Sequence, residues 1–295
     1  MILNSYAKLN LYLEVLSKRK DNYHNLKILF ERIDLCDKIT LRPRPDKSIK
    51  IECNHRGVPC DAKNLCYRSA KLLQDRFKVK QGLDIEIIKR IPVGAGLGGG
   101  SSNAATVLLG LNRLWKLGLS KKRLARLAKL VGCDVPFFIY EVPFALGLER
   151  GDKITPLKSL GKARLWHVLV VPKIKVSTPL IYGKWDEFSL KKSGVSLLTR
   201  PGRNVKIIPS SSAKKALAFI DKLLFNSLEP VTVKLYPEVR RVKEALERFG
   251  VKSVLMSGSG PAVFGVVSSG KEASSLGRSL RKLGKPWQVF TARTL

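Results

Sequence analysis

A glycine-rich segment, residues 92–104, is the part of the sequence whose residue types most directly imply chemistry. It reads PVGAGLGGGSSNA, and five of the seven residues from Gly94 to Gly100 are glycine. Glycine lets backbone N–H groups approach an anion closely, and the amino end of a helix carries roughly half a positive charge. Because the segment follows an expected strand at 83–88 and leads into an expected helix at 101–117, it predicts a phosphate-binding loop.

Two common phosphate loops are excluded by the residues around this segment. A Walker A loop ends in Gly-Lys-Ser or Gly-Lys-Thr, whereas Gly100 is followed directly by Ser101. A dinucleotide-binding loop is matched formally by the glycines, but it also needs an acidic residue about 20 positions further on. The corresponding stretch, 116–126, holds five basic residues and no acidic one. The loop therefore belongs to another class of phosphate site.

Four polar residues are further candidates for this chemistry, and position alone leaves each of them open. The hydroxyls of Ser101 and Ser102 can cap the helix, bind phosphate or help to hold Mg²⁺. Lys8 lies on an expected strand, where a lysine is ordinarily a solvated charge. Asp134 lies in a short turn before an apolar stretch that we expect to be a strand, and an aspartate there is ordinarily a turn residue.

Expected strands and helices alternate along the chain. Residues 6–15 alternate between apolar and more polar side chains, which predicts a half-buried strand. The other expected strands are 28–33, 38–42, 83–88, 165–171, 252–256, 262–267 and 287–291. Apolar side chains at intervals of three and four residues predict helices at 64–77, 101–117, 120–131, 213–225, 237–249 and 271–283. Residues 189–212 are expected to form a loop, and the interleaving predicts an α+β or α/β class.

Length, charge and cysteine content restrict the function further. A chain of 295 residues with 44% hydrophobic residues predicts a globular protein of two domains. The net charge of +32 is spread over both halves, with +14 in residues 1–150 and +18 in 151–295, so it favours anionic partners such as nucleotides and phosphorylated metabolites. The N-terminus has no basic region followed by a long apolar core, so we expect a cytoplasmic protein and no membrane association. Five cysteines without a CxxC pair predict neither a disulfide framework nor a zinc site.

Five segments together resemble the GHMP kinase superfamily. The glycine-rich segment resembles its PxGxGLGSS phosphate loop. The other four agree in order and spacing, and they are AKLNL at 7–11, DNYH at 21–24, GCDVPFF at 132–138 and MSGSGPAVF at 256–264. The longer form GLGGGSSNAA and the Tyr-His pair resemble one branch of the superfamily. That branch phosphorylates a cytidine-diphosphate-linked polyol in the non-mevalonate synthesis of isoprenoid precursors.

The resemblance implies an α+β fold of two domains. Residues 1–160 would form an N-terminal ATP-binding domain of the ribosomal-protein-S5-like kind, and residues 161–295 a C-terminal ferredoxin-like α/β domain on the substrate side. ATP and the small-molecule substrate would meet in the cleft between them. The γ-phosphoryl group of ATP, with Mg²⁺, would pass to the 2-hydroxyl of the polyol. We expect a monomer or homodimer without a specific nucleic-acid partner.

The resemblance also assigns roles to individual residues. Asp134 would be the catalytic base, and Lys8 the cation beside both the Asp134 carboxylate and the transferring group. The substrate would be bound by Asn10, Tyr23, His24, Thr178 and Tyr182, with the cytosine base at Tyr23, His24 and Tyr182. The nucleotide would be bound by Asn64, Lys89, Pro92, Gly94, Gly96, Leu97, Gly98, Gly99, Gly100, Ser101, Ser102, Asn103, Gly258 and Gly260. No protein-bound structural metal is expected.

Three departures from the family pattern leave these groups in place. Asn22 replaces the usual glycine of DGYH, and asparagine tolerates similar turn geometry. Asp152 stands where glutamate is usual, and Tyr182 where phenylalanine is frequent. Two alternatives stay open at this point. The chain could be another GHMP kinase that acts on mevalonate, homoserine or a sugar, or a basic RNA-binding protein.

Overall fold

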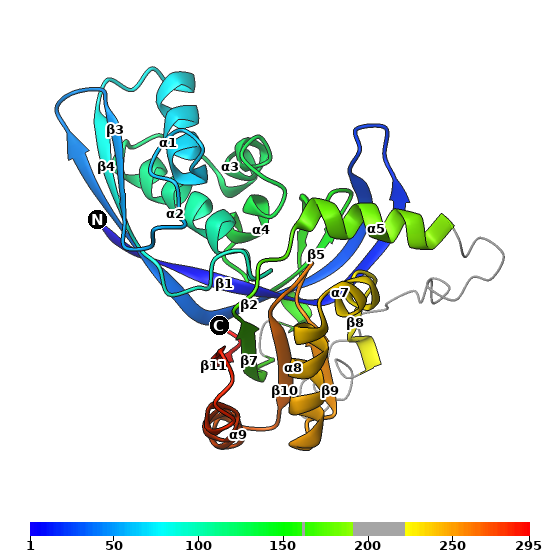
Figure 1. The fold of residues 1–295 in the computed structure, drawn as a ribbon. Helices are drawn as coiled ribbons and strands as arrows, with labels where there is room; N and C mark the ends of the chain where they lie inside the picture. The colour runs from blue at the N-terminus through cyan, green and yellow to red at the C-terminus, as the bar shows by residue number, and fades with distance from the viewer. Residues whose placement is uncertain (161–162, 191–221) are drawn as a thin grey trace.

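The computed structural model describes residues 1–160, 163–190 and 222–295, which form two sheets that pack against each other (Figure 1). The larger sheet has the strand order β3-β4-β2-β1-β8, with β5 added to β2 and β6 to β5, and the smaller has the order β11-β7-β10-β9. The larger sheet contains β1 (Ile2–Lys18), β2 (His24–Arg44), β3 (Ile49–Cys53), β4 (Gly82–Ile88), β5 (Phe144–Leu148), β6 (Lys153–Pro156) and β8 (Phe225–Asn226). The smaller contains β7 (Trp166–Pro172), β9 (Ser253–Met256), β10 (Val263–Val267) and β11 (Trp287–Arg293).

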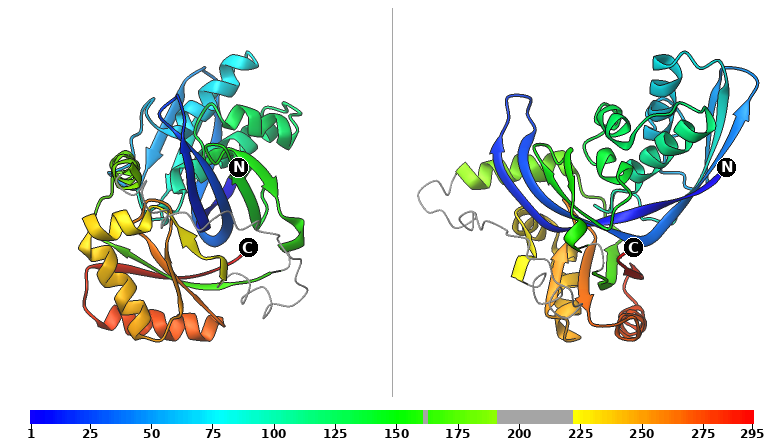
Figure 2. Two further views of the ribbon diagram at one scale, coloured as in Figure 1. Left: turned by 90° about the vertical axis from the view of Figure 1, so that its right-hand side faces the viewer. Right: turned by 180° about the vertical axis from the view of Figure 1, so that it is seen from behind.

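Helices cover the outer faces of both sheets (Figures 1 and 2). Over the larger sheet lie α1 (Leu65–Arg76), α2 (Gly99–Leu114), α3 (Lys121–Ala128) and α4 (Val135–Ile139). Over the smaller sheet lie α8 (Pro237–Arg248) and α9 (Gly270–Lys282). The remaining helices, α5 (Thr178–Leu190) and α7 (Glu229–Leu235), contact each other. A short 3-10 helix, Lys158–Leu160, follows β6.

Strand β7 shows how the layers are stacked. Its side chains alternate between two hydrophobic cores, with Val168 and Val170 in the core under α8 and α9. Leu169 and Val171 belong to the second core, which they share with apolar residues of β1 and β2 such as Leu9. The smaller sheet is therefore buried on both faces, and the order of layers is helix, sheet, sheet, helix. The α+β class is confirmed.

The prediction of a half-buried strand at residues 6–15 is wrong, because both faces of β1 are buried. Ala7, Leu9 and Leu11 pack toward the smaller sheet, but Leu13 and Val15 belong to the core on the opposite face. The reason is a register shift against β2 between Asn10 and Tyr12. One extra residue in a strand turns the following side chains to the other face. The apolar run of 7–15 thus serves two cores.

Other expected elements differ in extent. The expected strands 28–33 and 38–42 are parts of the single strand β2, and the helix expected at 101–117 begins two residues earlier and ends at Leu114. The apolar stretch after Asp134 is the helix α4 rather than a strand, since short apolar runs do not distinguish the two. Several elements were not expected, namely β3, β5, β6, α5 and α7. Most of the expected loop 189–212 and helix 213–225 lies outside the described residues, but Phe225 belongs to strand β8.

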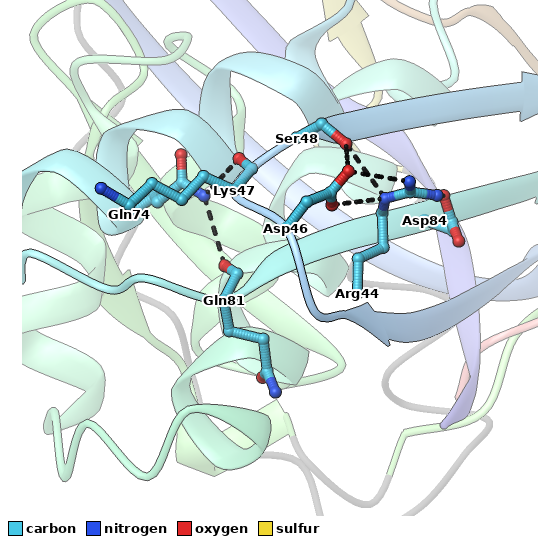
Figure 3. Close-up of polar contacts among 7 residues, drawn as sticks. All are labelled: Arg44, Asp46, Lys47, Ser48, Gln74, Gln81 and Asp84. Carbon is cyan, nitrogen blue, oxygen red and sulfur yellow. Dashed lines mark hydrogen bonds and ion pairs between the residues drawn. The ribbon is translucent and has the colours of Figure 1, made fainter.

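A polar cluster holds the turn between β2 and β3 (Figure 3). The guanidinium of Arg44 donates to the carboxylates of Asp46 and Asp84 over 2.8 Å. The hydrogen bonds from Arg44 keep the pKa of Asp46 well below its usual value. The amide of Gln74 on α1 donates to the backbone carbonyl of Lys47 in this turn and to that of Gln81 just before β4. The cluster contains none of the predicted site residues, so its role is to fasten this end of the larger sheet to α1.

The two halves of the chain are joined at more than one place. β6 ends at Pro156 and β7 begins at Trp166, but β8 returns to the larger sheet and pairs with β1. The boundary between residues 160 and 161 stays a prediction. Among the described residues no helix combines the length and the apolar character needed to cross a membrane.

Candidate active site

The glycine loop has an alternating backbone that explains its sequence. Gly94, Gly96 and Gly98 have φ angles of +70°, +78° and +68°, in the left-handed region that glycine adopts without steric cost. Ala95 and Leu97 between them are buried and anchor the loop in the core between the two sheets. Gly98 has no side chain to cap α2, which begins at the next residue. The amides at the start of α2 therefore remain available to an anion.

The loop is held close to two other segments. The backbone N–H of Lys8 on β1 donates to the carbonyl of Leu97 over 3.0 Å. A Cβ atom on Gly98 would lie 2.9 Å from Cγ of Lys8, and one on Gly96 would lie 2.2 Å from the carbonyl oxygen of Ser257. Side chains at these two positions would push the loop away from β1 and from the turn at 257–260. Packing alone therefore requires glycine at positions 96 and 98.

Two cavities meet at this loop, and both are lined by Gly96 and Gly98. The smaller, of about 330 Å³, is bounded by the loop, the start of α2 and the segment before α1. The larger, of about 540 Å³, is bounded by β1, the β1–β2 hairpin, the start of α4 and α5. The two cavities therefore adjoin the same stretch of the glycine loop.

Lys8 and Asp134 line the larger cavity beside the glycine loop. The Lys8 ammonium is 3.7 Å from the Asp134 carboxylate and donates a hydrogen bond to the side-chain carbonyl of Asn10. Burial lowers the pKa of Lys8 below its usual value, and the attraction of Asp134 opposes this shift. The Lys8 side chain is 4% exposed and the Asp134 side chain 34%. Both residues line the larger cavity, and the carboxylate is the more accessible of the two groups.

The far end of the larger cavity is aromatic. His24 stacks on Tyr182, with ring centroids 5.0 Å apart and an angle of 26° between the rings. Tyr23 also lines the cavity but is half exposed, and the Arg150 guanidinium lies 5.3 Å from the centre of its ring. Thr178 at the start of α5 shares a hydrogen bond of 2.7 Å with Ser259. The five residues predicted to bind substrate therefore line one cavity together with Lys8 and Asp134.

The turn before β2 has the geometry expected from its sequence. Asn22 adopts a φ of +62°, the left-handed conformation that asparagine tolerates better than most residues. The turn thus keeps its shape without the usual glycine, and it places Tyr23 and His24 at the rim of the larger cavity.

The smaller cavity collects most of the residues predicted to bind nucleotide. Asn64 caps α1, its side chain accepting a hydrogen bond from the amide of Cys66 over 2.8 Å. Lys89 forms an ion pair with the fully buried Asp37, and its ammonium is 3.0 Å from the place that a Cβ on Gly99 would occupy. Asn103 donates to the same carboxylate over 2.9 Å. Lys89 is therefore held beneath the start of α2.

Two predicted residues do not reach either cavity. The Ser102 hydroxyl accepts a hydrogen bond from Ser5 over 2.8 Å, and its amide donates to the Gly98 carbonyl within α2. Both polar groups of Ser102 are thus engaged, which leaves Ser101 as the hydroxyl facing the smaller cavity. Gly260 packs against Met256, and of the two predicted glycines in its turn Gly258 faces the larger cavity.

Three charged residues of the larger cavity and one buried carboxylate beside the glycine loop were missed in the sequence. Asp186 pairs with Lys18 and His24 at the far end of the larger cavity, and Arg150 lines its rim. Asp37 accepts hydrogen bonds from the amides of Arg90 and Ile91 just before the glycine loop. Asp186 lies one helical turn after Tyr182 on α5. This spacing would have indicated Asp186 as a site residue if a helix had been expected there.

The sequence is similar to known proteins over its whole length. Residues 64–141 match the GHMP kinases N terminal domain, and residues 212–286 match the GHMP kinases C terminal domain. A 4-diphosphocytidyl-2-C-methyl-D-erythritol kinase of Geobacillus sp. (strain WCH70) is 44% identical, with the alignment covering 100% of this chain and 97% of the relative. A kinase of the same name from Bacillus velezensis is 42% identical over 98% of this chain and 95% of its own.

Solved structures show the same similarity. A crystal structure of 4-(cytidine 5'-diphospho)-2C-methyl-D-erythritol kinase superposes with a TM-score of 0.78 at 32% identity, covering 99% of both chains. A homoserine kinase from Cytophaga hutchinsonii superposes with a TM-score of 0.70 at 19% identity, over 99% of this chain and 94% of its own. At that identity the second similarity concerns the fold alone.

Proposed function

The chain belongs to the GHMP kinase family, and on this premise we propose that it phosphorylates the 2-hydroxyl of 4-diphosphocytidyl-2-C-methyl-D-erythritol. It is an ATP-dependent small-molecule kinase that serves isoprenoid precursor synthesis. The acceptor and the roles of individual residues are the subject of the proposal. One observation carries it, which is that the ion pair of Lys8 and Asp134 lines the larger cavity while the Lys8 side chain packs under Gly98, a glycine that lines both cavities.

ATP binds in the smaller cavity in this proposal. The amides of Gly99 and Gly100 and the partial charge at the start of α2 attract its phosphates. The Lys89 ammonium beneath Gly99 adds a positive charge that Asp37 and Asn103 hold in place. The γ-phosphate then lies at Gly96 and Gly98, the two glycines that line both cavities.

Phosphoryl transfer needs positioning and charge stabilisation more than covalent chemistry. Asp134 accepts the proton of the attacking hydroxyl as the new P–O bond forms and the bond from phosphorus to the leaving ADP oxygen breaks. Lys8 keeps the carboxylate ionised and oriented, and its charge stabilises the equatorial oxygens of the transferring group. Asn10 fixes the Lys8 ammonium from the other side.

Mg²⁺ is proposed to enter with the nucleotide. No group of three or more His, Cys, Asp or Glu side chains suited to a metal ion occurs among residues 1–160, 163–190 and 222–295. Mg²⁺ in kinases is held by one or two protein oxygens together with phosphates and water, so it does not require such a cluster. Ser101 and Asp134 are the protein oxygens available beside the loop. When bound, the ion would neutralise part of the negative charge of the phosphates.

The cytidine part of the acceptor is proposed to lie at the aromatic end of the larger cavity. The cavity extends from Asp134 to His24, and the planar base stacks against the Tyr182 and Tyr23 rings there. The same residues argue against mevalonate or homoserine as acceptors, because these lack an aromatic ring. We further propose a cytoplasmic monomer or homodimer that needs no nucleic acid. The basic surface alone does not favour RNA as the ligand.

A phosphorylation assay tests the proposal. The chain is incubated with ATP, Mg²⁺ and equal concentrations of the cytidylylated polyol, mevalonate, homoserine or galactose, and phosphorus NMR locates the new ester. We expect one product, phosphorylated at the 2-hydroxyl of the methylerythritol unit, and at least 100-fold lower kcat/KM for the other alcohols. Preferential turnover of one of those alcohols would reassign the acceptor within the same family.

A further inference from the structure

His24 is held in one orientation at the end of the larger cavity. Its side chain is 4% exposed, it stacks on Tyr182, and Trp185 meets it edge-on with ring centroids 5.8 Å apart. Its Nε2 atom lies 2.7 Å from Oδ1 of Asp186, one turn further along α5. The other carboxylate oxygen of Asp186 accepts a hydrogen bond from the ammonium of Lys18 over 2.7 Å. The ring therefore has a charged partner on only one of its two nitrogens.

The state of Asp186 decides which nitrogen carries the proton. Burial raises the pKa of Asp186, but the hydrogen bonds from Lys18 and His24 outweigh it and the pKa is lowered from its usual value. An ionised carboxylate has no proton to donate, so Nε2 of His24 must be the donor in the bond of 2.7 Å. In the neutral ring Nδ1 then has a free lone pair and acts as an acceptor.

The remaining nitrogen is open to the cavity. Within the part of the chain that the structure describes, Nδ1 of His24 has no hydrogen-bond partner. Unlike the unpartnered polar atoms of the core, this nitrogen is not fully enclosed. His24 lines the larger cavity. An acceptor at this place can receive a hydrogen bond from an N–H group of the bound base, whereas its lone pair repels a carbonyl oxygen.

We propose that Asp186 is a positioning residue, which fixes the Nε2–H tautomer of His24 and so makes the cavity select a base that carries an exocyclic amino group. The inference rests on the proposed function, which places the base at His24. Cytosine presents an amino donor at the position where uracil presents a carbonyl acceptor. Asp186 thereby discriminates between the two pyrimidines without contacting either.

The tautomer can be measured directly by NMR. The sequence has only three histidines, His24, His55 and His167, so long-range ¹H–¹⁵N spectra of ¹⁵N-histidine-labelled enzyme are assignable by single replacements. In the wild type we expect the Nε2–H form at His24, with Nδ1 at the shift of an unprotonated nitrogen. In Asp186→Asn the side-chain amide can donate as well as accept a hydrogen bond. We therefore expect a mixture of the Nε2–H and Nδ1–H tautomers of His24. An Nδ1–H or doubly protonated ring in the wild type, or an unchanged tautomer in the variant, would overturn the proposal.

The kinetic consequence is a change in base preference. For Asp186→Asn we expect KM for the cytidylylated substrate to rise about 10- to 100-fold, the effect of losing one hydrogen bond to a buried group. The kcat value and the KM for ATP should stay within about twofold of the wild-type values. The ratio of kcat/KM for the cytidine substrate to that for its uridine analogue should fall by about the same factor as the KM for the cytidylylated substrate rises. Glu187→Gln is the matched control, because Glu187 is the next residue on α5 and pairs only with the exposed Lys184 among the described residues.

The two results separate the possible failures. Equal increases of KM for the cytidine and uridine substrates would mean that Asp186 only shapes the cavity, and this would contradict the inference. If the wild type phosphorylates another alcohol and neither nucleotide substrate, the proposed acceptor is wrong. The NMR measurement still tests the tautomer of His24 independently of that result.

Discussion

Lys8 packs directly beneath Gly98, so that a Cβ atom at position 98 would lie 2.9 Å from Cγ and 3.1 Å from Cε of the lysine. Phe138 closes the same space from α4, with its Cζ atom 3.0 Å from that point. The position of the ammonium is therefore set by the glycine loop, by β1 and by α4 together. The glycine loop and the Lys8 side chain form one packed unit.

Replacement of Gly98 by alanine tests this packing. We expect kcat to fall at least tenfold, because the new methyl group must displace Lys8 or Phe138. Gly94→Ala is the matched control, since Gly94 has a similar φ of +70° but no atom within 4 Å of its Cβ position. Both variants should lose about 1 kcal/mol of stability from backbone strain. Equal kcat values in the two variants would show that the contact with Lys8 is unimportant.

The pH dependence of kcat should report the buried ammonium. Burial lowers the pKa of Lys8 from its usual 10.5, and the attraction of Asp134 raises it. Because the charged form is required, we expect kcat to decline on the alkaline side at a pH below 10.5. In Asp134→Asn the raising effect is lost, so the decline of the residual activity should shift to lower pH. A shift to higher pH would contradict the assignment.

The buried pair of Asp37 and Lys89 should support both stability and nucleotide binding. Asp37 is fully buried and accepts hydrogen bonds from two backbone amides, from Asn103 and from Lys89. Asp37→Ala leaves the ammonium without its partner, so we expect a loss of about 3–5 kcal/mol in the free energy of unfolding. ATP affinity should fall as well.

Urea denaturation and ATP titration measure the two effects. Asp84→Ala is the control, because it breaks an ion pair with Arg44 in which the carboxylate is 38% exposed. Such surface pairs contribute about 0–1 kcal/mol. Similar losses in the two variants would argue against a supporting role of Asp37 beneath the glycine loop.

Thr294 should contribute to the attachment of the two sheets. Its hydroxyl donates to the buried carboxylate of Glu31 on β2 over 2.5 Å and accepts from the amide of Leu165, next to β7, over 2.8 Å. The same carboxylate oxygen lies 2.9 Å from Nε2 of the buried His167. Thr294→Val keeps the shape but removes these bonds, so we expect a loss of about 1–3 kcal/mol in the free energy of unfolding. Thr291→Val at an exposed position of β11 should change it by less than about 0.5 kcal/mol. Equal losses in the free energy of unfolding for the two variants would show that Thr294 does not contribute to the attachment of the two sheets.

The local sequence was sufficient for the glycine loop and its helix. The run of glycines between an expected strand and an expected helix predicts a glycine-rich loop that leads into a helix, and the structure has that form. The apolar periodicity likewise located α1, α8 and α9 to within two residues. These features depend on neighbouring residues only.

Features that depend on distant contacts were missed. The reversal of faces within β1 comes from a bulge against β2, and α4 is a helix because it packs on α2 and α3. Asp186 acquires its importance from His24, which lies 162 positions away in the sequence. No periodicity within α5 indicates that partner. The glycine loop was indicated by its own residues, whereas the roles of the other site residues came from resemblance to a family. The geometry brings most of these residues into two adjoining cavities.

The most direct test of the central claim is a single-turnover measurement on Asp134→Asn with ATP and the cytidylylated substrate both saturating. Loss of the base should slow phosphoryl transfer by about 10²- to 10⁴-fold, while the Kd for ATP measured by calorimetry stays within about threefold of the wild type. Glu141→Gln, shortly after α4, should leave both values unchanged. Transfer by Asp134→Asn at a rate close to the wild type would contradict the account of how the loop, Lys8 and Asp134 act together.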